Sequence, residues 1–266
     1  MAESKAAATP LPAATIVLLR DDPEEGLEIF MVVRHHQIDF ASGALVFPGG
    51  KIDEQDADPA LEAYCDGADP DPVMRAMQIG AIREAFEEAG VLLAREAESR
   101  QLVSGERLAT LEHYRTSLHS GEVSLKAFLD AEQLRLACDA LVRFAHWVTP
   151  DMMPKRFDTH FFIARAPEDH VLLHDGHESV DSVWIRPQQV LSDAAAGQRT
   201  VIFPTLRNVE KLAEAATVDA AITAAEAQPI VTVTPWTEKR DDGVWLRIPV
   251  EAGYRISEER MPSRGG

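Results

Sequence analysis

The stretch Arg83-Glu84-Ala85-Phe86-Glu87-Glu88-Ala89-Gly90-Val91 ends the strongest helix signal in this chain of 266 residues. The helix is predicted to begin at Pro72 and to end before Gly90, because proline favours the first helical position and glycine the position after the last. At about 100° per residue, apolar side chains such as Ile82 and Phe86 share one stripe. Glu84, Glu87 and Glu88 lie almost opposite that stripe, so three carboxylates share one patch.

The three carboxylates have little positive charge near them in the sequence. Arg83 is the nearby cation, one turn before Glu87, and Glu84 and Glu88 are like charges four residues apart. Such a pair costs a few tenths of a kcal/mol, and a solvated helix face normally carries cations between its anions. The pattern therefore favours a site for a positive ion, with a solvated face as the alternative. Oxygen ligands without nitrogen or sulfur suit Mg²⁺ or Mn²⁺ better than zinc.

The composition is that of an acidic globular protein. Acidic residues outnumber basic ones by 44 to 26, the formal net charge is −18, and 45% of the residues are hydrophobic, which excludes a disordered or collagen-like chain. This charge repels phosphate backbones and anionic lipids, so we expect no binding to nucleic acid or membranes. Two distant cysteines, Cys65 and Cys138, and an N-terminus unlike a signal peptide indicate a cytoplasmic location.

The remaining signals predict an α/β protein with a mixed sheet flanked by helices. Strand patterns occur at 13–19, 27–33, 44–47, 146–148, 160–164 and 183–185, and shorter ones at 231–233 and 244–248. Helical patterns occur at 96–143, 187–195 and 204–227, the last with a break near Thr217. Residues 1–12 are expected to form a flexible tail, because they are small, polar and punctuated by proline.

The quoted stretch resembles the REUxEExGU core of the Nudix hydrolases, in which U is a bulky apolar residue. Phe47-Pro48-Gly49-Gly50 resembles the loop that begins the same motif. Six fixed letters recur by accident with odds on the order of 10⁻⁵ in such a chain. In the family the first glycine stands fourteen positions before the arginine, whereas Gly50 stands thirty-three positions before Arg83. The glutamate expected six positions after that glycine is Asp56 here.

The insertion implied by this spacing resembles one subgroup of the family. That subgroup is related to the mammalian peroxisomal coenzyme A diphosphatases, and residues 40–47 and 156–162 strengthen the likeness. The resemblance implies a Nudix α/β/α sandwich over residues 13–210, with insertions at about 53–71 and 96–143. A C-terminal extension, 211–266, is expected to pack on the same domain.

The resemblance also assigns roles to individual residues. It implies attack of water on a pyrophosphate, with Mg²⁺ or Mn²⁺ held by Glu84, Glu87, Glu88 and the carbonyl of Gly49. Arg83 is expected to brace Glu87 and the loop. Glu178 stands six residues before Trp184, a spacing seen in several Nudix enzymes, and is expected to act as a fourth ligand or as the base.

Substrate contacts are expected from cations and one aromatic side chain. Lys155 and Arg156 lie between a proline and a strand, and are the candidates to bind a substrate phosphate. Arg34, at the end of the second strand, comes next, and Phe47 belongs to the glycine loop.

Three functions are consistent with these residues. The first is hydrolysis of coenzyme A or acyl-coenzyme A to 3′,5′-ADP and (acyl-)4′-phosphopantetheine, with residues 53–71 and 96–143 walling the pantetheine arm. The second is the same chemistry on ADP-ribose or another nucleotide-linked pyrophosphate. The third is a Nudix-fold ligand sensor without hydrolysis, which the intact trio of glutamates disfavours. The expected partner is a small phosphorylated nucleotide-type substrate, and a homodimer is left open.

Overall fold

A mixed β-sheet forms the centre of the protein. The structure is a computed structural model that describes residues 8–34, 43–171 and 179–261. The strand order is β10-β2-β1-β9-β8-β11, with β3 beside β2 and β4 beside β1. β1 pairs with β9 and β8 with β11 in parallel, and the other neighbours are antiparallel. The strands of this sheet are β1 (Leu11–Asp22), β2 (Gly26–Arg34), β3 (Leu45–Val46), β4 (Gly49–Lys51), β8 (Val142–Val148), β9 (Phe157–Arg165), β10 (Ser179–Ile185) and β11 (Thr232–Val233).

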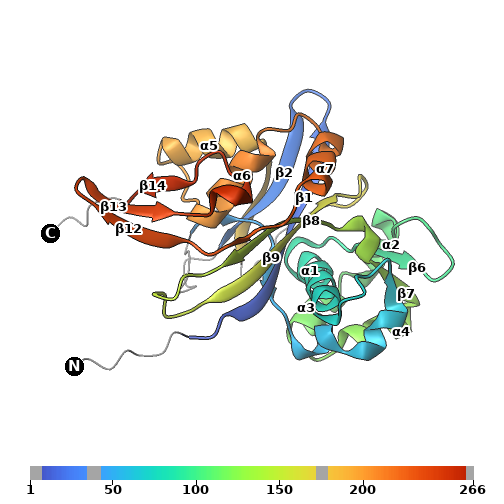
Figure 1. Ribbon diagram of the computed structural model, residues 1–266. Helices are drawn as coiled ribbons and strands as arrows, with labels where there is room; N and C mark the ends of the chain where they lie inside the picture. The colour runs from blue at the N-terminus through green and yellow to red at the C-terminus, as the bar shows by residue number, and fades with distance from the viewer. Residues whose placement is uncertain (1–7, 35–42, 172–178, 262–266) are drawn as a thin grey trace.

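Helices cover both faces of this sheet, as Figure 1 shows. On one face lies α1, with α2, α3 and α4 around it, and on the other lie α5, α6 and α7. Along β1, Ile16 and Leu18 belong to the core on the α1 face, and Val17 and Leu19 to the core on the opposite face. The α/β/α sandwich is thus confirmed. The helices are α1 (Pro72–Ala89), α2 (Gly105–Leu111), α3 (Tyr114–His119), α4 (Leu125–Glu132), α5 (Pro187–Ala195), α6 (Phe203–Leu212) and α7 (Val218–Ala227).

The helix that carries the motif begins and ends where the sequence predicts. The side chain of Asp71 accepts a hydrogen bond from the Val73 N–H at 3.0 Å, and Pro72 follows as the first helical residue. Gly90 ends the helix with φ at +67°, a left-handed conformation that glycine adopts without steric cost. Because the helix ends at Ala89, Glu84, Glu87 and Glu88 lie in its last turns.

The predicted insertions build a second, smaller sheet beside α1. Residues 53–71 contain two short 3₁₀ helices, η1 (Glu54–Ala57) and η2 (Pro59–Tyr64), followed by β5 (Cys65–Asp66). Residues 96–143 contain the helices α2, α3 and α4, as the helical pattern predicts, but Leu134–Ala137 is a strand, β7, between β5 and β6 (Ala94–Glu96). There Leu134 and Leu136 are buried and Arg135 is half-buried, which is the period of a strand rather than a helix.

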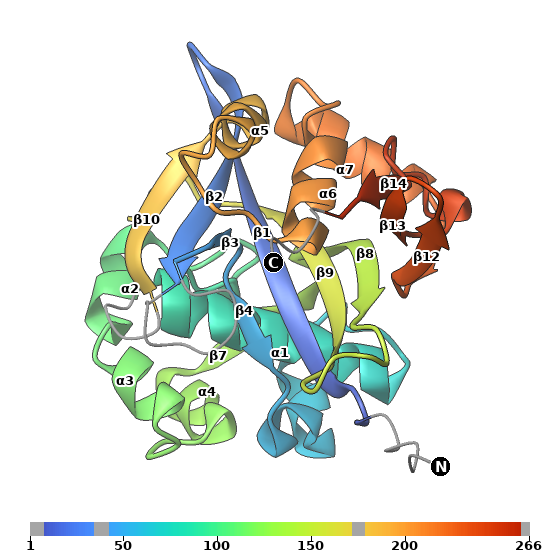
Figure 2. The same cartoon turned by 90° about the vertical axis from the view of Figure 1, so that its left-hand side faces the viewer.

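The C-terminal extension packs on the same core. α7 lies against β8, and β11 adds a strand to the edge of the main sheet. The strands β12 (Trp236–Arg240), β13 (Gly243–Arg247) and β14 (Glu258–Arg260) form a separate sheet beside α6, as Figures 1 and 2 both show. Tyr254 connects these parts, because its hydroxyl accepts from the Trp147 indole N–H at 2.9 Å and donates to Asn208 at 2.7 Å.

The N-terminal tail is shorter than expected. Leu11 and Pro12 already belong to β1, because they pair with Phe157 and Asp158 of β9. Among the helices of the described ranges, none combines the length and the apolar character that crossing a membrane requires.

Candidate active site

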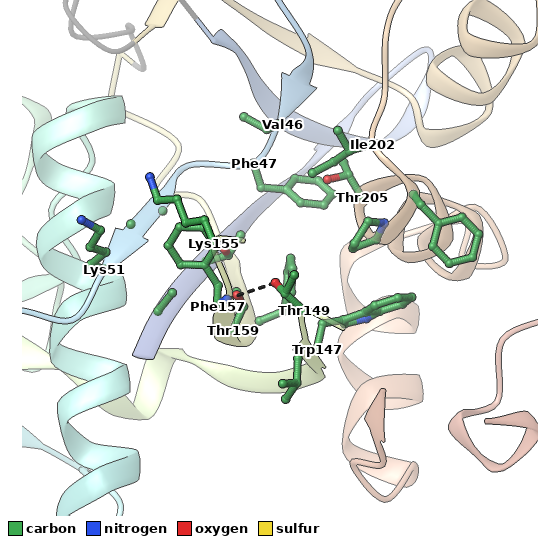
Figure 3. Close-up of a pocket in the computed structure, with 18 of the residues that line it drawn as sticks. Val46, Phe47, Lys51, Trp147, Thr149, Lys155, Phe157, Thr159, Ile202 and Thr205 are labelled. Atoms are coloured by element: carbon green, nitrogen blue, oxygen red, sulfur yellow. Dashed lines mark hydrogen bonds between the residues drawn. The ribbon is translucent and has the colours of Figure 1, made fainter. Parts of the chain in front are cut away.

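A pocket of about 900 Å³ lies beside the last turns of α1. Arg83, Glu84 and Glu87 form one part of its lining, together with the loop from Val46 to Lys51. Figure 3 shows Lys51 and Lys155 on one side of the pocket and Trp147 and Ile202 on the other. The pocket therefore has a charged part at α1 and an apolar part away from it.

The three glutamates of α1 are buried, Glu84 and Glu87 in the lining of the charged part and Glu88 behind Gly49. Glu84, Glu87 and Glu88 are 9%, 4% and 6% exposed, which excludes the solvated helix face that the sequence left as an alternative. Glu88 accepts a hydrogen bond from the Gly49 N–H at 2.8 Å. Burial raises the pKa of Glu84 to about 8 and also raises the pKa of Glu87. Carboxylates with raised pKa values are those that a bound cation would keep ionised.

Arg83 is fully engaged by groups of the protein. Its Nε and Nη2 donate to the two oxygens of Asp56 at 2.9 Å each, and its Nη1 donates to Glu84 at 2.9 Å. It also lies 3.3 Å from Glu87 and donates to the Lys51 carbonyl at 3.0 Å. Asp56 is 0% exposed, so this ion pair is shielded from solvent. This geometry fits the expected bracing role of Arg83.

The two glycines of the loop allow it to pack closely between Glu84 of α1 and strand β1. A Cβ atom on Gly50 would lie 2.5 Å from an oxygen of Glu84. A Cβ on Gly49 would lie 2.5 Å from the Ala14 carbonyl, and Gly49 has a φ of +153°. A side chain at Gly50 would push β4 away from α1, and one at Gly49 would push it away from β1.

The cluster is rich in oxygen ligands and short of positive charge. Asp56, Glu84 and Glu87 surround the guanidinium of Arg83, and Glu88 lies against the Gly49 N–H. His119 contributes an imidazole 3.4 Å from Glu87. Carboxylates and a nearby backbone carbonyl suit a hard divalent cation such as Mg²⁺ or Mn²⁺, so the residues present fit such an ion.

Three of the four expected substrate residues line the pocket, and Arg156 does not. Lys155, Arg34 and Phe47 line it. Arg156 is 8% exposed and turns away: it donates to the carbonyls of Thr149 and Ala8 at 2.9 and 2.8 Å, and pairs with Asp151 at 2.6 Å. Its chain neighbours Lys155 and Phe157 line the pocket, whereas Arg156, in the turn directly before β9, is directed at the other residues of that turn. The expected phosphate contact of Arg156 is therefore corrected to a contact that holds the turn between β8 and β9.

The expected walls of the pocket are also corrected. Of residues 53–71 and 96–143, only Asp53 and His119 line the pocket within the described ranges. The apolar wall comes instead from the β8–β9 turn, the start of α6 and the C-terminal segment. Its members include Met152, Met153, Phe203, Pro204, Pro235, Leu246 and Met261. No local sequence signal could identify these residues, because they come from segments far apart in the chain and meet only in the folded protein.

Glu178 lies outside the described residues, so its expected role as a ligand or base stays a prediction. The other predicted metal-site residues lie together at one end of the pocket: Gly49, Arg83, Glu84 and Glu87 line it there, and Glu88 contacts Gly49.

The sandwich fold and the buried glutamates of α1 define a Nudix domain. Residues 63–212, more than half of the chain, match the family model described as the NUDT19 Nudix domain, and the chain belongs to this family of Nudix hydrolases. The crystal structure of a NUDIX hydrolase from Alicyclobacillus acidocaldarius is similar, with a TM-score of 0.69 and 26% identity over 81% of this chain and 96% of that one.

Two curated relatives carry more specific names. The human acyl-coenzyme A diphosphatase NUDT19 is 28% identical over 239 residues, covering 73% of this chain and 62% of the relative. The peroxisomal coenzyme A diphosphatase ndx-8 of Caenorhabditis elegans is 33% identical over 79 residues, covering 30% of this chain and 26% of the relative. The chain thus spans less than two thirds of the length of both. The cytoplasmic location expected from the sequence stays a prediction.

Proposed function

We propose that this chain hydrolyses the pyrophosphate bond of coenzyme A and acyl-coenzyme A, releasing 3′,5′-ADP and (acyl-)4′-phosphopantetheine. The observation that carries the proposal is one pocket in which buried carboxylates and lysines adjoin an apolar wall. A ligand with a pyrophosphate and a long arm matches both parts. The names of the human and nematode relatives support the same substrate class.

The metal part of the proposal rests on the glutamates. Glu84, Glu87 and Glu88, with the Gly49 carbonyl, would hold Mg²⁺ or Mn²⁺. When bound, such an ion offsets the charge that develops on the phosphates and activates water. Arg83 holds the carboxylates of Glu84 and Glu87 in place, so that their orientation does not depend on the substrate.

The remaining pocket residues bind and orient the substrate. Lys51 and Lys155 supply positive charge beside the carboxylates, which an anionic pyrophosphate requires in a chain of net charge −18. Phe157 and Trp147 supply apolar surface that excludes water from the arm. Glu178 is proposed as the base or a fourth ligand.

A substrate panel tests this proposal. The purified chain is incubated with Mg²⁺ or Mn²⁺ and with coenzyme A, acyl-coenzyme A of several lengths, ADP-ribose or a dinucleotide, and the products are identified by mass spectrometry. We expect coenzyme A and its esters to have the highest kcat/KM. Faster hydrolysis of ADP-ribose would make the alternative substrate class correct, and binding without hydrolysis of any compound would indicate a sensor.

A pair of variants on β13 tests the apolar wall. Leu246 lines the pocket and Val244, two residues earlier, is exposed and does not. Leu246→Asp should lower kcat/KM for long-chain acyl-coenzyme A at least about tenfold more than for coenzyme A, because the new carboxylate would contact the apolar acyl group of the substrate. Val244→Asp should leave that ratio unchanged. Equal effects of the two variants would mean that the arm binds elsewhere.

A further inference from the structure

A second group of ligand-type side chains lies on the strands β8 and β9. His146, Asp158 and His160 each offer one ligand atom, and the three atoms lie within 4.8 Å of one another. In the parts of the chain that the structure describes, this is the one group of three or more such residues that meets this distance. This group is distinct from the glutamates of α1, none of which belongs to it.

This group faces away from the pocket. Trp147 and Thr159, the chain neighbours of His146 and His160, line the pocket. Successive side chains of a strand point to opposite faces of the sheet, so the histidines and Asp158 occupy the other face. Phe162, two residues after His160, belongs to the core on the α1 face, so this group lies on the sheet face that α1 covers.

The backbone pairing sets the geometry of the group. His146 lies directly opposite His160 in the antiparallel register, and their rings stack with centroids 4.0 Å apart and planes 12° apart. Asp158 stands two residues from His160 and reaches the Nε2 of His146 at 2.5 Å. Cross-strand and diagonal neighbours of this kind share one face of a sheet. The three ligand atoms therefore converge without any special loop.

A residue of the next strand orients the first histidine. Thr232 of β11 pairs with His146, and its Oγ1 lies 2.8 Å from the Nδ1 of that ring. When Nδ1 carries the proton and donates it to Thr232, the lone pair of Nε2 and the carboxylate of Asp158 face the same point. Metal-binding histidines commonly donate their second ring N–H to an oxygen in this way.

We propose that His146, Asp158 and His160 form a second metal site, which binds a transition-metal ion of the Zn²⁺ class. Two imidazoles and one carboxylate are a ligand set that such ions favour, and the fourth position is left to water. With metal–ligand bonds of about 2.0–2.2 Å, tetrahedral ligands lie about 3.3 Å apart, so the His146–Asp158 contact must open by roughly 0.8 Å. The Asp158 side chain is 42% exposed, which permits this movement and gives the ion access.

Such an ion would connect β8 to β9 on the sheet face opposite Trp147 and Thr159. The turn between these strands carries Lys155 and Met153, which line the pocket. The metal is therefore a structural clamp on the strands that carry one wall, and it takes no part in the hydrolysis.

Titration of the full chain with zinc chloride tests the site, with excess Mg²⁺ present to saturate the site proposed at α1. We expect His160→Gln and Asp158→Asn each to remove the same binding event, measured by calorimetry as one equivalent of zinc. Thr232→Val should weaken that event about 10- to 100-fold, because it removes the partner that orients the ring. The matched control is His113→Gln, an exposed histidine directly before α3, which should leave the event unchanged.

Two further measurements make the result decisive. Circular dichroism in chelator should be the same for all four variants, which shows that lost binding is not lost folding. In ¹⁵N spectra of the imidazoles, zinc should shift both His146 and His160 in the parent chain. Equal zinc stoichiometry and affinity in the parent and in His160→Gln would overturn the site. Because no substrate is used, a failure of the proposed hydrolysis leaves this outcome unaffected.

Discussion

The buried pair of Arg83 and Asp56 should be a main source of stability around the carboxylate cluster. Asp56→Ala removes both acceptors that hold the guanidinium at 2.9 Å, and also the acceptor of the Asp53 N–H. Arg83 is 3% exposed and Asp56 is 0% exposed, so solvent does not replace the lost partner. Breaking a buried ion pair by removing one partner costs about 3–5 kcal/mol. Since Arg83 keeps its contacts with Glu84 and Glu87, we expect the loss of unfolding free energy to lie at the lower end of this range, about 3 kcal/mol.

Urea denaturation followed by circular dichroism measures this loss, with Glu54→Ala as the matched control. Glu54 is an exposed acidic residue of the same 3₁₀ helix, and its removal should change the free energy of unfolding by less than about 0.5 kcal/mol. The double variant Asp56→Leu/Arg83→Met should lose about 1–3 kcal/mol less than the sum of Asp56→Leu and Arg83→Met, because neither member of the pair is left without the other. A loss below about 1 kcal/mol for Asp56→Ala, together with additive effects, would refute the reasoning.

Three further predictions concern single side chains. Glu88→Gln should lower kcat roughly 10²-fold or more, with the melting temperature nearly unchanged, and full activity in the presence of chelator would contradict the metal assignment. Arg156→Ala should cost about 1–3 kcal/mol in urea denaturation with KM unchanged, whereas Lys155→Ala should raise KM several-fold without affecting stability; the opposite pattern would restore the phosphate contact of Arg156. Tyr254→Phe removes the acceptor of the Trp147 N–H and the donor to Asn208 and should cost about 1–3 kcal/mol, so an unchanged unfolding curve would show that this network does not stabilise the C-terminal segment.

Features that depend on neighbouring residues in the chain could be predicted from the sequence. The limits of α1 follow from Pro72 and Gly90, and the common patch of Glu84, Glu87 and Glu88 follows from helical spacing. The alternation of apolar residues likewise placed the main strands to within a few residues. The burial of the glutamates could not be predicted, since it depends on the glycine loop that packs over them.

Features that depend on distant segments were missed or wrong. The conformation of the turn before β9 decides whether Lys155 or Arg156 faces the pocket, and a run of two cations does not reveal that conformation. The strand β7 was predicted as helix because its leucines favour both structures, and only pairing with β5 and β6 decides between them. The wall from Pro235 to Met261 lies far along the chain from the glutamates, so no local spacing connects them.

The most direct test of the central claim is hydrolysis of an acyl-coenzyme A by the parent chain and by Glu87→Gln, with Mg²⁺ and with chelator. Glu87 lines the pocket and is 4% exposed, and the glutamine keeps its size but removes its charge. We predict that mass spectrometry finds 3′,5′-ADP and acyl-4′-phosphopantetheine from the parent only when Mg²⁺ is present, and at least about 10²-fold less from Glu87→Gln. Equal product from both chains, or from the parent in chelator, would contradict the claim that the α1 carboxylates form the hydrolytic site.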